Sequence, residues 1–135
     1  MKRAVAISAY VGLLAAGIAA LPFKSSRVSQ NSQVMVHCPN PANPGGLVTP
    51  PHDTIALGDS VRWRTTGAVT DTLVITLKNP GQGWPFLGGA RAGSSTVQSG
   101  PSSAKGRYGY NVHFTCRLPA GGSQPVDIDP DIIIE

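Results

Sequence analysis

Apolar and polar residues alternate along several short segments from residue 33 onward, the pattern of half-buried β-strands. The clearest case is 108–116, where an apolar or aromatic side chain recurs at every second position. Similar segments predict further strands over 33–38, 54–57, 61–65, 72–77, 95–99, 126–128 and 132–134. No apolar period of 3.6 residues follows residue 24, so the pattern favours an all-β fold.

Glycines and prolines separate these predicted strands. Residues 39–52 contain five prolines and a Gly-Gly pair, so neither a helix nor a central strand is expected there, only a surface loop of polyproline character. Short strands spaced by such turns predict a Greek-key β-sandwich over residues 33–135. Its predicted core comprises Val34, Val36, Ile55, Val61, Trp63, Leu73, Ile75, Leu77, Tyr110, Val112, Phe114 and Ile132.

The N-terminus has the pattern of an export signal. Lys2 and Arg3 precede an apolar run over 4–23 that is rich in small residues, which predicts a secretory signal peptide over 1–20. The run is also close to the roughly 20 residues that span a bilayer, so an uncleaved membrane anchor is the alternative. A polar linker over 21–32 follows. Either way the domain is expected to be exported: periplasmic or secreted, or held at the membrane by residues 4–23.

Two cysteines, Cys38 and Cys116, follow the export segment. In an oxidising compartment an even number of cysteines indicates a disulfide, here closing a long loop. A metal-binding thiol pair is the weaker interpretation, because the close Cys/His spacing of such sites is missing.

Charge and motifs exclude several classes of function. Without Lys2 and Arg3, nine basic residues stand against seven acidic ones, and the basic residues are scattered. Nucleic-acid binding is therefore not expected. The sequence also lacks nucleophile elbows, phosphate loops and metalloprotease motifs, so we expect no enzyme activity.

Two motifs resemble those of the cupredoxins, the plastocyanin-like blue-copper proteins. The first is Gly58-Asp59-Ser60-Val61-Arg62-Trp63, a Gly-Asp turn before a strand with an aromatic residue. The second is Gly106-Arg107-Tyr108-Gly109-Tyr110 near the C-terminus. The resemblance covers most of residues 33–135 and implies a cupredoxin-like β-sandwich.

The same resemblance implies that the type 1 copper ligands are absent. Such a site needs two imidazoles, a thiolate and a weak axial ligand. Counting on from the two motifs places Asp71 and Thr115 at the histidine positions and Val112 at the thiolate position. The axial methionine would fall near residues 119–120, which are Pro and Ala. We therefore expect no copper cofactor, and we expect Val112 to be a core residue.

Other polar residues offer only weak candidate sites. His37 and His113 would lie near each other if their strands paired, and would then be possible Cu(II) or Zn(II) ligands; two surface histidines are the simpler interpretation. Asp71 lacks a catalytic partner in the nearby sequence and suits a turn. The acidic residues at 127, 129 and 131 lack the pattern of a calcium loop and are expected to protect an edge strand.

The glycine-rich loop around Trp84 and Phe86 is the remaining candidate. Aromatic side chains on a surface loop are typical of protein-binding hot spots, whereas the competing interpretation is a plug over one end of the sandwich. From the sequence we therefore expect an exported, copper-less cupredoxin-like domain that serves as a non-catalytic binding or structural module for an unidentified protein partner. The alternative is a copper carrier or electron-transfer protein with a non-standard site.

Overall fold

The computed structural model of the protein describes residues 28–67 and 69–135. The predicted signal peptide or anchor over 1–20, and most of the predicted linker over 21–32, lie outside the described residues. Within the described part of the chain, no helix is long and apolar enough to cross a membrane.

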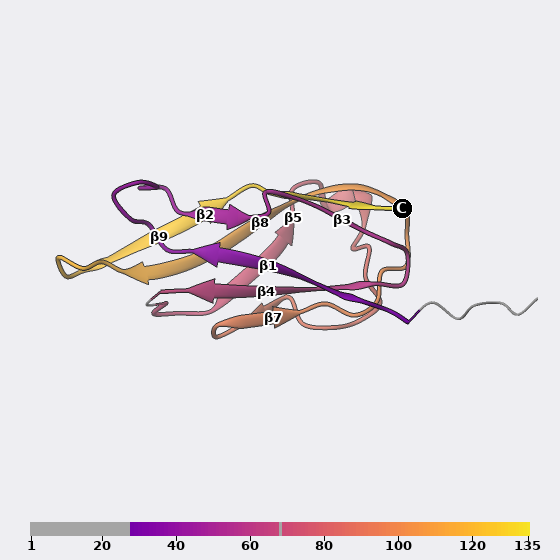
Figure 1. The fold of residues 1–135 in the computed structure, drawn as a ribbon, viewed down its shortest axis with the longest axis horizontal. Helices are drawn as coiled ribbons and strands as arrows, with labels where there is room; N and C mark the ends of the chain where they lie inside the picture. Colours follow the sequence, from indigo (N-terminus) through magenta and orange to yellow (C-terminus); the bar gives the residue numbers. More distant parts are fainter. Residues whose placement is uncertain (1–27, 68) are drawn as a thin grey trace, which may run out of the picture.

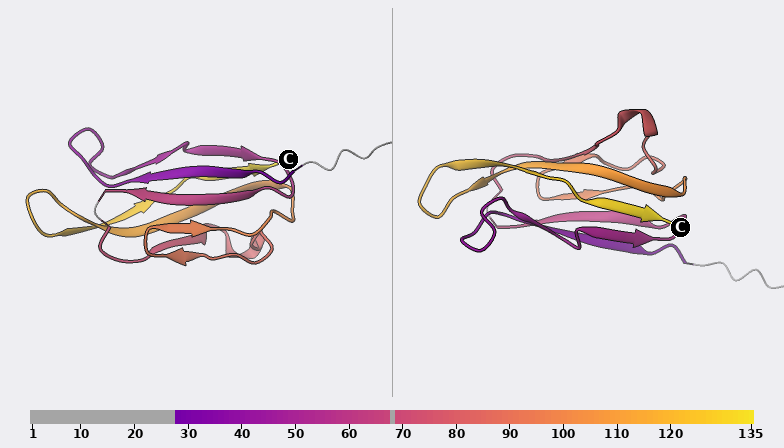
Figure 2. Two further views of the ribbon diagram at one scale, coloured as in Figure 1. Left: turned by 60° about the horizontal axis from the view of Figure 1, so that its bottom comes forward. Right: turned by 90° about the horizontal axis from the view of Figure 1, so that it is seen from above.

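Ten β-strands within residues 28–67 and 69–135 form two sheets that face each other in two layers (Figures 1 and 2). One sheet has the order β2-β1-β4-β7, with β1 at Asn31–His37, β2 at Leu47–Thr49, β4 at Ser60–Thr66 and β7 at Thr96–Gln98. The other has the order β3-β10-β8-β5-β6, with β3 at His52–Ile55, β10 at Asp131–Ile134, β8 at Gly106–Arg117, β5 at Leu73–Leu77 and β6 at Ala92–Gly93. Strand β9, Ser123–Ile128, also pairs with β8. A 3₁₀ turn at Pro80–Gln82 follows β5.

Both sheets are mixed. β1 runs parallel to β4 and β3 runs parallel to β10, whereas the other pairs are antiparallel. The long strand β8 organises the second sheet, because it pairs with β10, then β5, then β9 along its length. The predicted all-β class is therefore confirmed, and the two facing sheets are consistent with a β-sandwich.

The core lies between the two sheets and follows the alternation in the sequence. Every predicted core residue is buried except Leu77, which is half-buried at the end of β5. Trp63 is the largest fully buried side chain, at 1% exposure. Val48, Val97, Val126 and Ile134 extend the same core.

Several predicted boundaries differ from those of the structure, and two of the differences have a clear physical reason. The proline-rich segment contains a short strand, β2, at the edge of its sheet. An edge strand pairs on one side only, so the prolines before and after β2 do not interrupt the hydrogen bonding of a central strand. β1 begins at Asn31, inside the predicted linker. The buried Asp59 explains this early start, because its carboxylate accepts hydrogen bonds from the backbone N–H groups of Gln30 (2.9 Å) and Ala56 (3.2 Å).

The two ends of the sandwich differ in what they carry. The described chain begins, and the C-terminus lies, at one end, while β1 and β8 both run toward the opposite end (Figure 1). The loop after β1 and the turn between β8 and β9 therefore project from the end of the molecule farthest from residue 28. This end also holds both cysteines.

Candidate functional site

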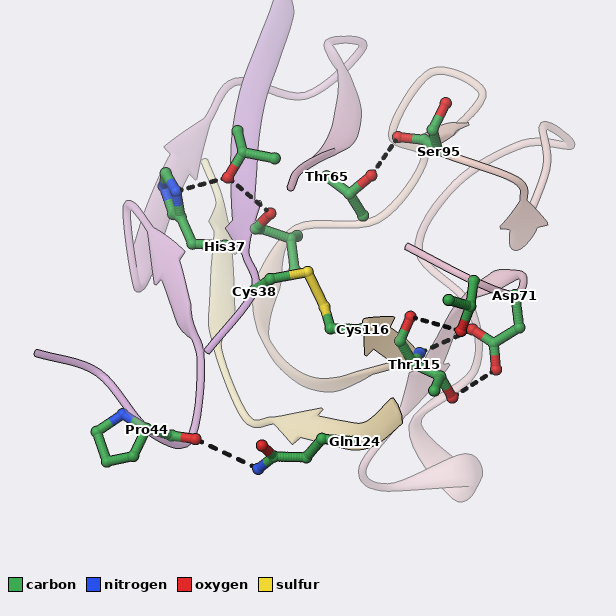
Figure 3. Close-up of a disulfide and its surroundings, with 12 residues drawn as sticks. His37, Cys38, Pro44, Thr65, Asp71, Ser95, Thr115, Cys116 and Gln124 are labelled. Carbon is green, nitrogen blue, oxygen red and sulfur yellow. Dashed lines mark hydrogen bonds between the residues drawn. A yellow bond between two sulfur atoms is a disulfide. The ribbon is translucent and has the colours of Figure 1, made fainter. Parts of the chain in front are cut away.

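A disulfide between Cys38 and Cys116 joins the two sheets (Figure 3), at the end of the sandwich opposite the start of the described chain and the C-terminus. Cys38 directly follows β1 in one sheet, and Cys116 is near the end of β8 in the other. Their Cα atoms are 5.9 Å apart. The predicted pairing is therefore present. Cys116 is fully buried and Cys38 is half-buried, so the disulfide lies at the boundary between the core and the surface.

Two adjoining hollows open beside this disulfide. The first, about 570 Å³, is lined by Cys38 among others, and the second measures about 420 Å³. Pro39, Asn40, Leu118 and Pro119 line both, so the two form one depression, which we call the disulfide-end groove. Its walls come from the proline-rich loop after β1 and from the turn between β8 and β9.

The groove is apolar, and its polar rim carries no acidic residue. Pro41 and Pro44 line the second hollow, and the amide of Gln124 donates a hydrogen bond to the carbonyl of Pro44 (3.3 Å), which ties the loop to β9. His37 and Arg117 line the first hollow, where the imidazole of His37 is hydrogen-bonded to the hydroxyl of Thr66 (2.8 Å). Proline side chains lose little conformational entropy on binding, so the groove is preformed for an apolar ligand.

Of the positions counted as lost copper ligands, one is buried in the core and two are hydrogen-bonded to each other. Val112 is fully buried in the middle of β8, opposite Ile75 on one side and Ile128 on the other. Asp71 instead contacts Thr115, accepting hydrogen bonds from its backbone N–H (2.7 Å) and its hydroxyl (2.6 Å) (Figure 3). The prediction that Val112 is a core residue is therefore confirmed, and Asp71 ties the segment before β5 to β8.

These hydrogen bonds lower the pKa of Asp71 below its ordinary value of 3.8, first through the hydroxyl of Thr115 and then through its N–H. A carboxylate with a lowered pKa in the folded state stabilises the fold above its unfolded pKa, and this contribution disappears as the pH falls through the folded value. We therefore expect Asp71→Asn to be less stable than the wild type at pH 7 in urea unfolding. The difference should shrink between about pH 5 and pH 2. A difference that stays constant with pH would contradict this role, and Thr115→Val should reproduce the loss of pH dependence.

The structure does not bring His37 and His113 together. His37 ends β1, which pairs only with β2 and β4, whereas His113 lies on β8 in the other sheet. Their strands do not pair in the described structure, so the condition on which a shared metal site depended is not met. His113 instead contacts Asp127 (2.7 Å), and His52 contacts Asp131 (3.0 Å). Among residues 28–67 and 69–135, no three His, Cys, Asp or Glu side chains are grouped so as to hold a metal ion.

The acidic residues near the C-terminus are divided among separate partners. Asp127 pairs with His113 on β8, Asp129 with Lys78 (3.0 Å), and Asp131 with both Arg107 and His52. Each therefore pairs with a basic side chain on or beside a neighbouring strand, and among the described residues the three carboxylates are not grouped around one cation site.

The loop containing Trp84 and Phe86 closes over the core. Phe86 is buried, and its ring meets Trp63 edge-on with centroids 6.3 Å apart, while the ring of Trp84 lies 6.5 Å from Trp63. The bridge between Phe86 and Ser102 holds the loop in place. Phe86 is therefore not available to a partner, which corrects its prediction as a contact residue; of this loop, Leu87 is the large side chain left exposed, at 64%.

Comparison with known proteins adds no assignment. No family model matches the chain, and a search of curated proteins found no match.

Sequence reasoning missed the residues of the disulfide-end groove. The local signal was the density of prolines in 39–52, which was interpreted only as a loop. That this loop lies against the turn containing Leu118 and Pro119 depends on which sheet each strand joins, and the local pattern does not carry that information.

Proposed function

We propose that this protein is an exported, non-catalytic binding module with a copper-less cupredoxin-like fold, and that it binds an extended apolar segment of a partner protein in the disulfide-end groove. The observation that carries the proposal is the pair of adjoining hollows beside Cys38, framed by prolines and Leu118. Preformed, mostly apolar depressions of a few hundred Å³ are the usual form of ligand sites.

Strand order supports the cupredoxin-like, Greek-key part of this proposal. The first strand lies parallel to β4 in one sheet, and the motif-bearing strand β8 lies between β5 and the final β9–β10 segment in the other. The turn Gly58-Asp59 and the aromatic Trp63, which carry the resemblance, are respectively at the β3–β4 turn and in the core. The absence of ligand side chains at the counted positions supports a function other than electron transfer.

The disulfide supports export, because such bonds persist in oxidising compartments.

The location of the groove on the molecule supports the choice of binding surface. The loop after β1 and the turn between β8 and β9, which line the groove, lie at the end of the sandwich opposite the start of the described chain and the C-terminus (Figure 1), so neither of these covers it.

The chemistry of the walls favours an extended, apolar protein segment that also bears an acidic residue. Proline rings and Leu118 offer apolar contacts to two successive side chains. Arg117 at the rim offers a cation, and no carboxylate lines either hollow. A cationic or strongly polar ligand would find no complementary charge and few hydrogen-bonding partners in these walls.

Photo-crosslinking in the producing cells tests the proposal. A photoreactive phenylalanine analogue at Asn40 should give one discrete protein adduct, whereas the same residue at Thr54, exposed on β3 of the other sheet, should give none. The cross-linked partner segment, made as a synthetic peptide, should bind the wild-type protein saturably. Leu118→Asp should weaken that binding at least tenfold, because a carboxylate then replaces an apolar wall and repels the acidic ligand.

An adduct at both positions, or peptide binding unaffected by Leu118→Asp, would overturn the groove as the binding surface. The copper-carrier alternative gives a different result. Stoichiometric Cu(II) binding by the oxidised protein that is lost on His113→Asn, without any adduct at Asn40, would support the carrier in place of the module.

A further inference from the structure

A third hollow, separate from the disulfide-end groove, lies beside the outer edge of β5. It has a volume of about 450 Å³, and its lining includes Thr76, Leu77, Pro80, Trp84 and Arg91. The groove shares no lining residue with it. The proposed binding function does not use this hollow, so its ligand chemistry is a separate question.

Backbone hydrogen-bonding groups of β5 are unpaired at this edge. In an antiparallel pair, the backbone N–H and C=O groups of successive residues point alternately toward the neighbouring strand and away from it. Lys78 donates to Gly109 of β8 (3.0 Å), while Tyr110, directly opposite Leu77, donates to Pro130 instead. The N–H and C=O of Leu77 therefore point away from β8.

The neighbouring strand on that side, β6, begins too late in the chain to pair with Leu77. β6 is in register only with Leu73 and Val74, and Ile75 donates to the carbonyl of Arg91 (2.8 Å) just before β6 begins. The N–H of Leu77 has no acceptor within the described parts of the chain. The wall of the hollow thus presents a backbone donor.

Arg91 adds a cation with no carboxylate partner. Its guanidinium lies over the ring of Trp84, 4.3 Å from the centroid, and no acidic side chain of residues 28–67 or 69–135 pairs with it. Its backbone is fixed by the hydrogen bond from Ile75. Stacking on an aromatic ring holds the planar guanidinium while leaving its N–H groups free at the ring edge.

Trp84 supplies a further donor and an apolar wall. Its indole Nε1 is buried and has no acceptor among the residues that the structure describes. A buried donor without a partner is costly, and it favours any ligand or rearrangement that brings an oxygen to it. The residues that line the hollow therefore carry three hydrogen-bond donors, on Leu77, Trp84 and Arg91, together with aliphatic and aromatic surface.

From this arrangement we propose that the hollow binds a small organic carboxylate, its oxygens on the Arg91 guanidinium and the Leu77 N–H and its apolar body against Trp84 and Pro80. A planar guanidinium matches a carboxylate in a two-point hydrogen bond. The apolar walls select an anion with a hydrocarbon body over a fully hydrated inorganic ion.

Benzoate is a suitable probe, tested by NMR titration of the purified protein. Saturable benzoate binding should shift the Leu77 backbone amide and the Trp84 indole signals together. Benzamide, which lacks the charge, and inorganic phosphate, which lacks the apolar body, should each bind at least tenfold more weakly, the effect of one charge-assisted hydrogen bond or one buried ring.

Arg91→Gln should weaken benzoate binding at least tenfold. Arg91→Lys should weaken it less, because lysine keeps the positive charge but cannot form the two parallel hydrogen bonds of a guanidinium. The matched control is Arg64→Gln, an exposed arginine on β4 of the other sheet, which should bind as the wild type does. Thr76→Trp, at an exposed position on the wall, should block the hollow while the melting temperature shows that the fold is retained.

Three outcomes would overturn the proposal: equal binding by Arg91→Gln, equal binding of phosphate and benzoate, or benzoate shifts confined to residues away from β5. The groove variant Leu118→Asp should leave benzoate binding unchanged. The Arg91 variants therefore test the carboxylate site, and Leu118→Asp tests the groove, so the two proposals can be rejected independently.

Discussion

Replacing Cys38 and Cys116 together by alanine is expected to lower the free energy of unfolding by about 4 kcal/mol and the melting temperature by more than about 10 °C. The disulfide closes a loop with a sequence separation of 78 residues, so its removal greatly enlarges the conformational freedom of the unfolded chain. It is also the one disulfide among the described residues, and it cross-links one sheet to the other. Urea unfolding under non-reducing conditions measures the effect.

The reduced wild-type protein is the control for this variant. Reduction removes the cross-link and keeps both sulfur atoms, so it should reproduce most of the loss measured for the double variant. A further loss in the double variant would come from the space left at Cys116, which is fully buried. Unfolding midpoints that are equal before and after reduction would show that loop closure does not stabilise this fold.

Alternation in the sequence was sufficient to locate most strands. The period of two over 108–116 corresponds to β8, whose inward side chains are buried in register with those of β5. The short strand β2 was missed because its edge position, and not its composition, makes a strand next to prolines acceptable. The start of β1 was missed because Asp59, a residue distant in sequence, fixes it.

Local patterns were less informative about the candidate sites. The pairing of Cys38 with Cys116 followed from counting cysteines, and needed no geometry. The relation between His37 and His113 depended on which strands are neighbours. Because β1 and β8 belong to different sheets, the strand pairing that a shared metal site required does not occur. The Arg91–Trp84 contact gave no signal at all, because it depends on the course of an irregular loop.

The second large effect is expected for Trp63→Ala, which should lower the free energy of unfolding by about 3 to 5 kcal/mol. Trp63 is 1% exposed, and its ring lies 5.6 Å from Tyr110 and 6.3 Å from Phe86. Its indole N–H donates to the hydroxyl of Tyr110 (3.0 Å). The substitution thus removes core volume, aromatic contacts and a buried hydrogen bond at one position, and chemical unfolding measures the sum.

Two less drastic variants separate these contributions. Trp63→Phe keeps a ring and loses the hydrogen bond, and Tyr110→Phe removes the acceptor of the same bond. Burial raises the pKa of Tyr110, so its hydroxyl stays neutral across the ordinary pH range and the comparison can be made at any convenient pH. In a double-mutant cycle the coupling between the two positions should be about 1 kcal/mol.

Loss of Trp63 should also release the loop that covers it. The rings of Trp84 and Phe86 both pack against Trp63, so amide hydrogen exchange around residues 84–86 should become faster in Trp63→Ala than in Leu87→Ala, which removes an exposed side chain of the same loop. If Trp63→Ala instead costs less than about 1 kcal/mol and exchange in the loop is unchanged, the loop is not held by the core. Trp84 and Phe86 would then again be candidate contact residues for a partner. The carboxylate site proposed beside Trp84 would also lack a rigid side chain to define it.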